Sequence, residues 1–288
     1  MIVDFHTHVF PDKIAKRALD KLKHNSHTEP FSDGTLESLI MKERADGIDI
    51  SVIQPVATTP EQVISINNKA RENNDIYERR GAVSFAAIHP DFKDYKAELN
   101  RIKEMGFRGI KIHPVYQGVN IDDIRFLRII EKAAELGLIV LTHGGIDIGF
   151  LDSVKCSPKM IRHVIDEIGD FKFVAAHMGG WKNWDEVPEY LADTNVYLDT
   201  SFSTGKLTPL DDGYYKTEEL ELLTQDEFIK LLNAFGAERI IFGTDSPWGN
   251  PENDIAFIKK LPVSEKEKSE ILGENAESLC HFTNCKQV

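Results

Sequence analysis

Short apolar segments alternate with helical patterns along most of the chain. The apolar segments are nearly continuous, which is typical of strands covered on both faces of a parallel sheet; they span residues 2–5, 50–54, 82–88, 109–112, 138–141, 171–176, 196–198 and 240–242. Amphipathic segments lie between them, at residues 61–73, 95–105, 123–136, 159–168 and 226–235. Eight strands alternating with helices over about 250 residues predict a (β/α)8 TIM barrel. An open doubly wound sheet is the alternative, but it usually has fewer strands.

No repeat or linker divides the sequence, so we expect one domain over residues 1–288. Two connections, at about 23–35 and 201–224, are too long for simple turns and are predicted to be long loops. Loops of this length on a compact domain are usually lids or binding loops, although a solvated excursion without a role is the alternative. Residues 274–279 are predicted to form a helix that packs below the barrel.

Composition limits the partners of the protein. The 34 Lys and Arg residues against 47 Asp and Glu give a net charge of −13, which opposes binding to nucleic acid. No apolar stretch approaches the roughly 20 residues that cross a membrane. The three cysteines are scattered and odd in number, which favours reduced thiols in a cytoplasmic protein. A small-molecule substrate is therefore the expected partner.

Polar residues gather where the predicted strands end. His6 and His8 follow the first strand, while His143, His177 and Asp245 follow later ones. In a parallel barrel these strand ends open onto one face, so the five side chains should converge. His6 and His8 are two residues apart and should both face the barrel axis. Two hydrogen-bonded histidines would explain this pair alone, but the complete set predicts a site for a divalent metal ion.

Five motifs resemble the amidohydrolase superfamily, in the amidohydrolase-related branch that includes aminocarboxymuconate-semialdehyde decarboxylase. They run in the family's order over nearly the whole chain, as Asp4-Phe5-His6-Thr7-His8, Gly106-Phe107-Arg108-Gly109-Ile110-Lys111-Ile112-His113-Pro114, Thr142-His143-Gly144-Gly145, Ala176-His177-Met178-Gly179-Gly180 and Phe242-Gly243-Thr244-Asp245-Ser246-Pro247-Trp248.

The resemblance implies a mononuclear metal site. Its ligands would be His6, His8, His143 and Asp245, and Asp245 would also accept a proton. His177 would polarise the substrate or activate water, or else only hydrogen-bond to a metal-site residue. Mixed nitrogen and oxygen donors favour Zn2+, with Mn2+, Fe2+ and Co2+ as alternatives.

Four further residues are candidates for substrate binding: Lys111, His113, Trp181 and Trp248. Lys111 should face inward beside His113, where other superfamily members carry a carbamylated lysine between two metals. It could instead pair with an interior carboxylate such as Asp4, or reach a substrate carboxylate. The histidine and the two indoles could equally serve hydrogen bonding and packing.

The favoured activity is hydrolysis of an amide, ester or lactone of a small organic molecule by a metal-bound hydroxide. The alternative is a non-oxidative decarboxylase of an aromatic or unsaturated acid. Decarboxylation needs a cation for the departing carboxylate, and the sequence alone does not place one in the pocket. A metal-binding protein without catalysis is a third reading, and barrels of the resembled branch are often dimers, so a homodimer is one expectation.

Overall fold

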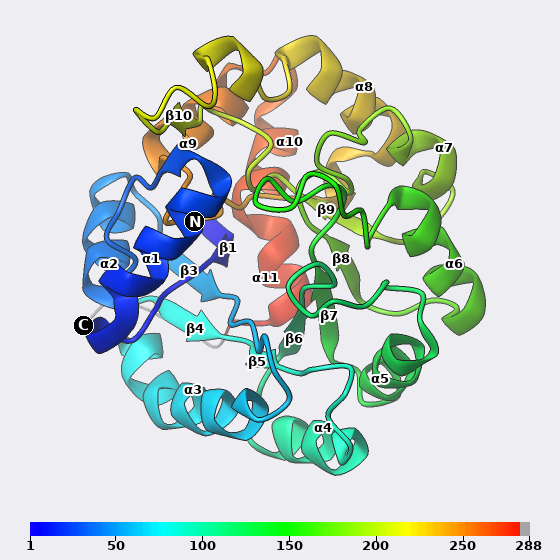
Figure 1. The fold of residues 1–288 in the computed structure, drawn as a ribbon. Coiled ribbons are helices and arrows are strands. Elements are labelled where there is room, and N and C mark those ends of the chain that lie inside the picture. The colour runs from blue at the N-terminus through cyan, green and yellow to red at the C-terminus, as the bar shows by residue number, and fades with distance from the viewer. Residues whose placement is uncertain (283–288) are drawn as a thin grey trace.

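The computed structural model describes residues 1–282 of the chain, and its strands form the barrel of a (β/α)8 fold. A three-stranded sheet has the order β1-β3-β4, and a six-stranded sheet has the order β11-β9-β8-β7-β6-β5. All pairings within these two sheets are parallel. Figure 1 shows the strands around a central axis with helices outside them. The strands are β1 (Val3–Thr7), β3 (Ile50–Ile53), β4 (Ala82–Ser84), β5 (Ala86–Ala87), β6 (Gly109–Ile112), β7 (Ile139–Thr142), β8 (Phe173–Ala175), β9 (Tyr197–Asp199) and β11 (Ile240–Ile241).

Backbone contacts join the two sheets into a ring. β4 and β5 are two halves of one strand interrupted at Phe85, whose N–H donates to the carbonyl of Ile53 at 2.9 Å. On the other side, β1 meets the segment after β11: the Phe5 N–H donates to Phe242 and the Asp245 N–H donates to His6, both at 2.9 Å. No strand ladder of the described residues spans this second seam. Single hydrogen bonds, among them that of the His8 N–H to Ser246 at 2.7 Å, and the bridge of Thr7 with Ser246 hold the first and last strands together.

The helices pack around the barrel through apolar faces, as in α5, where Phe126, Ile129, Ile130 and Ala133 are buried at helical spacing. The helices α5 and α6 are capped at their N-termini by Asp123 and Ser157, whose side chains accept from N–H groups of the first turn. The helices are α1 (Asp12–Ser26), α2 (Leu36–Ala45), α3 (Gln62–Arg79), α4 (Tyr95–Glu104), α5 (Ile124–Glu135), α6 (Pro158–Ile168), α7 (Val187–Leu191), α8 (Gln225–Phe235), α9 (Pro251–Lys260), α10 (Glu265–Ser269) and α11 (Asn275–Cys280).

The core has two layers, one on each side of the strands. Side chains such as Ile110 and Val140 pack outward against the helices. Val3 and Phe5 pack inside the barrel together with Ala276 and other residues of the α11 region. Figure 1 shows α11 crossing the middle of the ring. The helix predicted below the barrel is therefore confirmed.

The two predicted long loops are in fact partly ordered against each other. Helix α1 continues to Ser26, and β2 (Thr28–Glu29) then pairs antiparallel with β10 (Thr208–Pro209). The His27 ring stacks on Tyr214 with centroids 3.7 Å apart. The predicted long loops at 23–35 and 201–224 thus contain short ordered elements, because each segment supplies hydrogen-bond partners to the other across about 180 residues of sequence.

Two further expectations concern membranes and thiols. In the described part of the chain, no helix combines the length and the apolar character needed to span a bilayer. Cys156 and Cys280 are buried and free. Cys285 lies outside the described residues.

Candidate metal centre

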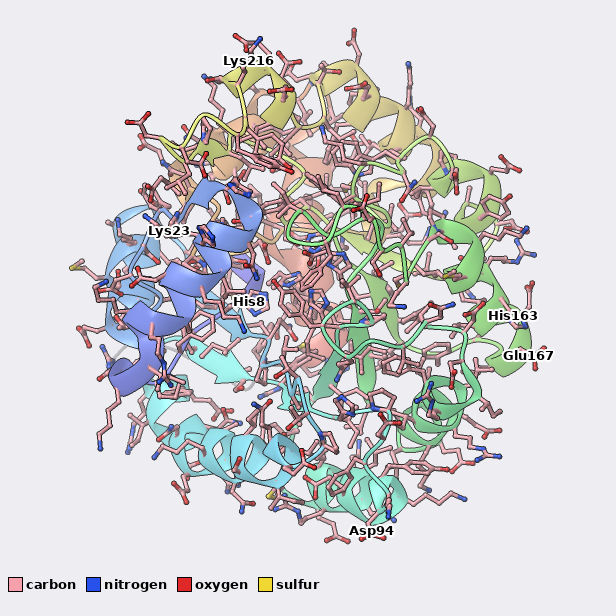
Figure 2. All side chains as sticks on the ribbon, in the orientation of Figure 1. His8, Lys23, Asp94, His163, Glu167 and Lys216 are labelled. Atoms are coloured by element: carbon pink, nitrogen blue, oxygen red, sulfur yellow. The ribbon has the colours of Figure 1, made fainter. Side chains whose placement is uncertain are left out.

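An irregularity in β1 sets the direction of its two histidines. Asp4 pairs with Ser51 and Thr7 with Ile53, so β1 has one more residue than β3 over this stretch. Such a bulge redirects the side chains that follow it. Phe5 lies inside the barrel, and His6 and His8 beyond it also face inward. Figure 2 shows His8 pointing toward the middle of the ring, whereas His163 and Glu167 lie on its outer rim.

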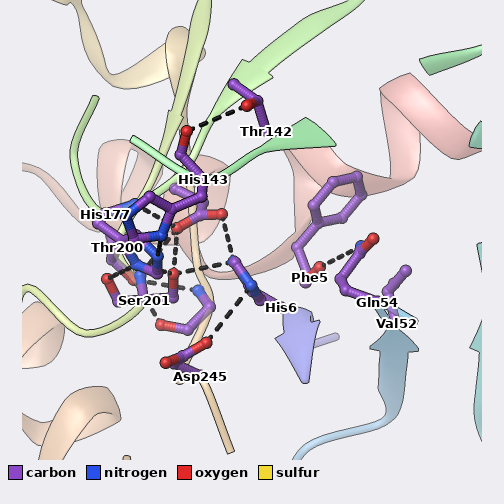
Figure 3. Close-up of polar contacts among 12 residues, drawn as sticks. Phe5, His6, Val52, Gln54, Thr142, His143, His177, Thr200, Ser201 and Asp245 are labelled. Carbon is purple, nitrogen blue, oxygen red and sulfur yellow. Dashed lines mark hydrogen bonds and ion pairs between the residues drawn. The ribbon is translucent and has the colours of Figure 1, made fainter. Parts of the chain in front are cut away.

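The Nε2 atoms of His6 and His8 lie 3.2 Å apart and share one carboxylate neighbour. The Asp245 Oδ1 atom is 3.4 Å from His6 and 3.2 Å from His8. Figure 3 shows the contact between His6 and Asp245. The three atoms lie within the distance that a single metal ion bridges. This part of the predicted ligand set therefore comes together.

The hydrogen bonds behind these histidines suit a metal ion. The Nδ1 atom of His8 lies 2.7 Å from the carbonyl of Gln54, and that of His6 lies 2.8 Å from Asp199 Oδ2. Both partners are acceptors, so each Nδ1 carries the proton and each Nε2 presents a lone pair. Two lone pairs and a carboxylate thus meet at one point, an arrangement that a divalent cation would stabilise.

The pKa values at the centre favour the metal-binding forms. Burial, followed by the charge of Lys111, lowers the pKa of His6 well below its usual value. Burial acts to raise the pKa of Asp245, but the contact with His8 and the neighbouring imidazoles outweigh it and lower the pKa. Neutral histidine and ionised aspartate are the states that coordinate metals.

His143 and His177 lie beside this group. His177 Nε2 is 3.0 Å from His143 Nδ1, and the His177 ring stacks on His6 with centroids 5.3 Å apart. The His177 Nδ1 atom donates to the carbonyl of Ser201 at 3.0 Å. The His143 Nε2 atom is buried and has no hydrogen-bond partner among the described residues. His143 thus has a nitrogen free for a ligand, although it is not within ligand distance of the His6, His8 and Asp245 group.

Sequence reasoning missed Asp199, which ends β9. This buried carboxylate contacts His6 and accepts from the backbone N–H groups of His177 at 3.0 Å and Ser201 at 3.1 Å. It therefore fixes two of the predicted site histidines at once. The signal was present, because Asp199 follows a buried strand as Asp245 does.

Lys111 lies inside the barrel beside the metal ligands. Its Nζ atom is 3.1 Å from His6 Nε2, and the residue is 1% exposed. Burial lowers its pKa to about 8, against the opposing attraction of Asp199 and Asp245. The alternative pairing with Asp4 does not occur, because Asp4 instead accepts from Thr244 and the backbone of His6. The centre therefore contains a buried cation.

The other predicted substrate-binding residues surround the same space. The His113 ring stacks on His143 with centroids 4.4 Å apart, and its Nε2 lies 3.5 Å from Asp147 Oδ2. Trp181 and Trp248 belong to one apolar cluster. All of them line one cavity of about 1150 Å3 together with the candidate metal ligands and Lys111.

Asp147 should make stability depend on pH. Burial raises its pKa to about 6, partly offset by the N–H of Gly149. The neutral carboxyl makes its full contribution to the free energy of unfolding below about pH 4, and this contribution is lost as the pH rises through about 6. We expect Asp147→Asn to be about 3 kcal/mol more stable than the wild type above pH 7 and equally stable at pH 4. Urea unfolding of the metal-free proteins at both pH values measures the difference, and equal curves at pH 7.5 would refute the burial effect.

Two glycine pairs hold the loops after β7 and β8 together. Gly145 has φ +85°, and a Cβ there would overlap the backbone of Gly180 and Trp181. The Ile146 N–H donates to Trp181 at 3.0 Å, and the Trp181 N–H donates to Gly144 at 3.0 Å. The close approach is therefore between two loops that carry His143 and His177.

Gly145→Ala should lower the free energy of unfolding by at least about 3 kcal/mol, because both backbone strain and overlap result. Gly118→Ala is the matched control, since Gly118 has φ +72° but open space around its Cβ position. That variant should cost only about 1 kcal/mol. Denaturant unfolding of the two variants checks the difference, and similar losses would show that overlap contributes nothing.

Comparisons with known proteins agree with this geometry. A family model described as amidohydrolase matches residues 3–282. Comparison of the sequence with curated proteins gives no match.

Solved structures share the fold over nearly the full chain. An uncharacterised TIM-barrel protein from Bordetella bronchiseptica is 19% identical, with a TM-score of 0.72 and coverage of 98% of both chains. The 2,6-dihydroxybenzoate decarboxylase from Rhizobium is 16% identical, with a TM-score of 0.61 and 98% coverage of both. A 5-carboxyvanillate decarboxylase from Novosphingobium aromaticivorans with bound manganese and 3-methoxy-4-hydroxy-5-nitrobenzoic acid is 13% identical, with a TM-score of 0.68 and coverage of 98% and 97%.

Proposed function

Because the chain belongs to the amidohydrolase family, we propose that it is a metal-dependent, non-oxidative decarboxylase of an aromatic or unsaturated carboxylic acid. The prediction of a hydrolase was wrong: the similar structures that carry an enzyme name are mainly decarboxylases. The metal motif could not reveal this, because the same ligand set serves both reactions in the resembled branch.

The observation that carries the proposal is Lys111. Decarboxylation requires a cation that holds the carboxylate, whereas hydrolysis of a neutral amide or lactone does not. Lys111 Nζ lies 3.1 Å from His6 Nε2 and lines the cavity. The cations Lys13, Lys69 and Arg80 also line the cavity but do not touch the metal ligands in the described contacts. Lys111 is thus the ammonium group positioned to meet a substrate beside the metal.

We assign the metal to His6, His8 and Asp245. His143, the predicted fourth ligand, has a free Nε2 atom but lies outside ligand distance of this group, and it would have to approach to complete the set. A bound divalent ion would supply positive charge that orients the substrate's oxygen atoms and stabilises the negative charge developing in the reaction. Manganese in two similar decarboxylases supports Mn2+ as the first ion to test, beside Zn2+. The family and the donor set support a divalent ion in general.

The other steps of decarboxylation are assigned to residues that line the cavity. Lys111 would hold the substrate carboxylate until the bond to the neighbouring carbon breaks and carbon dioxide leaves. The electron pair of that bond stays on the carbon, which must then take a proton. Asp245, which is ionised at rest, would take a proton from solvent and pass it to that carbon, and His177 would polarise a substrate oxygen. His113, Trp181 and Trp248 would form the walls that orient the ring.

A panel of hydroxylated aromatic acids, amides and lactones tests the proposal with the metal-loaded protein. Release of carbon dioxide in equal amount to the acid consumed, with formation of the decarboxylated product, is the expected result. Hydrolysis of amides or lactones without carbon dioxide release would overturn it.

Lys111→Met should lower kcat/KM for decarboxylation by about 100-fold, because a buried charge that pairs with the carboxylate is removed. Lys206→Met is the control, since Lys206 is exposed and should leave the rate unchanged. Metal content of both variants is measured alongside, so that loss of the ion is distinguished from loss of the cation. Full activity in Lys111→Met would reject the role.

A further inference from the structure

The cavity continues well beyond the metal centre. Its volume of about 1150 Å3 exceeds the 300–1,000 Å3 that usually accommodates a drug-sized ligand. One end of the cavity is lined by the metal ligands, Lys111 and the indoles of Trp181 and Trp248. The rest, called here the side extension, lies between α1 and α3 and is lined by residues of both helices. Figure 1 shows α1, α2 and α3 on the same side of the barrel.

One wall of the side extension is an apolar row on α1. Ile14, Ala18 and Leu22 all line the cavity at a spacing of four residues, so they form one stripe of the helix. The adjoining face of α1 is already used, because Ala15 and Leu19 are buried. Ile14 remains 40% exposed. The row is therefore apolar surface that no part of the described chain covers completely.

The other wall is one face of α3. The lining residues recur at helical spacing and are Gln62, Ser65, Ile66, Lys69, Ala70, Asn73 and Tyr77. They extend over about 22 Å of helix, at 1.5 Å per residue. Beyond Tyr77 the side extension ends near the ion pair of Arg80 with Glu37, whose atoms are 2.6 Å apart.

The polar side chains of this wall are satisfied within the protein. Gln62 Oε1 accepts from the N–H of Thr58 at 2.8 Å, and Ser65 donates to the carbonyl of Gln62 at 2.9 Å. Asn73 donates to the hydroxyl of Tyr77 at 2.9 Å. Lys69 pairs with Glu72 at 3.3 Å. With these groups engaged, the wall offers mainly carbon surface, and Ile53 and Leu36 add more between the helices.

We infer that the side extension binds an extended apolar substituent of the substrate, whose carboxylate lies at Lys111 and the metal. The substrate class is then an aromatic or unsaturated acid with an alkyl or alkenyl chain. This rests on the proposed function for the carboxylate end only. The chain end follows from the continuity of the cavity and from the uncovered apolar row of α1.

Binding of 4-alkylbenzoates with chains from methyl to octyl tests the inference without requiring turnover. The manganese-loaded protein is titrated, and quenching of tryptophan fluorescence is followed because Trp181 and Trp248 line the cavity. Each added methylene should lower Kd by about fourfold until the extension is filled. A Kd that does not change with chain length would overturn the inference.

Ala18→Phe should abolish most of the preference for octyl over methyl, because the new ring fills the space beside Leu22. Arg17→Phe is the matched control: it adds the same ring on the same helix at an exposed position outside the cavity lining. Ser65→Phe repeats the test from α3 if the first variant does not fold. An octyl preference that persists in both cavity variants would contradict the assignment.

The same series separates this inference from the proposed function. Chain-length-dependent binding without any release of carbon dioxide would reject the decarboxylase and keep the side extension as a binding site. Decarboxylation of unsubstituted acids, with no tighter binding when an alkyl chain is added, would keep the decarboxylase and reject the side extension as a binding site.

Discussion

Asp245→Asn should reduce carbon dioxide release by at least about 1,000-fold. The substitution keeps the shape of the side chain but removes the charge that completes the ligand set and the group proposed to pass the proton to carbon. His6 and His8 would retain their partners Asp199 and Gln54, because those contacts lie on the far side of each ring. Steady-state rates with the acid that the wild type decarboxylates best give the measurement.

Two controls make this result specific. Asp166→Asn alters an exposed aspartate that pairs with Arg162 on the outer surface and should leave turnover unchanged. Thermal unfolding of Asp245→Asn reports whether the fold survives. A variant that is folded, holds its ion and releases carbon dioxide at more than a tenth of the normal rate would disprove the proton-transfer role.

Removal of the metal should abolish turnover and lower stability together. The ligand atoms of His6, His8 and Asp245 lie 3.2–3.4 Å from one another. Without the cation, the repulsion between their lone pairs is no longer compensated. A ligand at 1,000 times its Kd stabilises the folded state by about 4 kcal/mol, so chelation should lower the melting temperature measurably. Elemental analysis should find about one ion per chain before chelation, and Mn2+ should restore both properties.

His8→Ala tests whether this ion is the one at the predicted centre. That variant should lack the ion and show no further change on chelation. His163→Ala is the control, because His163 is 51% exposed on the outer surface (Figure 2) and should behave like the wild type. Normal metal content in His8→Ala would place the ion elsewhere.

The sequence predicted the barrel well because its strands are buried on both sides and therefore nearly uniformly apolar. The strand at 109–112 was predicted with its observed bounds. Helix α3 was predicted to end at residue 73 but continues to Arg79, because Tyr77 packs against Ile53 and Leu39. This tertiary contact outweighs the low helix propensity of the Asn-Asn-Asp run. The pairing of β2 with β10 had no local signal, since it depends on two distant segments.

The same reasoning explains the site. The five polar residues after strands converge because the barrel fixes where strand ends lie. Asp199 was missed although it directly follows the predicted strand 196–198, because no motif marked this carboxylate. The contact of Lys111 with His6 could be anticipated from its inward direction, but its distance required the three-dimensional arrangement of β1 and β6. The side extension arises from how α1 and α3 are placed beside each other, and the residue spacing within either helix does not reveal that placement.

The seam between β1 and the segment after β11 has a consequence for biosynthesis. One of its hydrogen bonds joins His6 and Asp245, which are also proposed to hold the ion. The two are 239 positions apart, so a nascent chain emerging from the ribosome cannot assemble the centre until nearly all of it has been translated. Ion binding would therefore occur only late in folding, and chains terminated before Asp245 would not bind the ion at this centre.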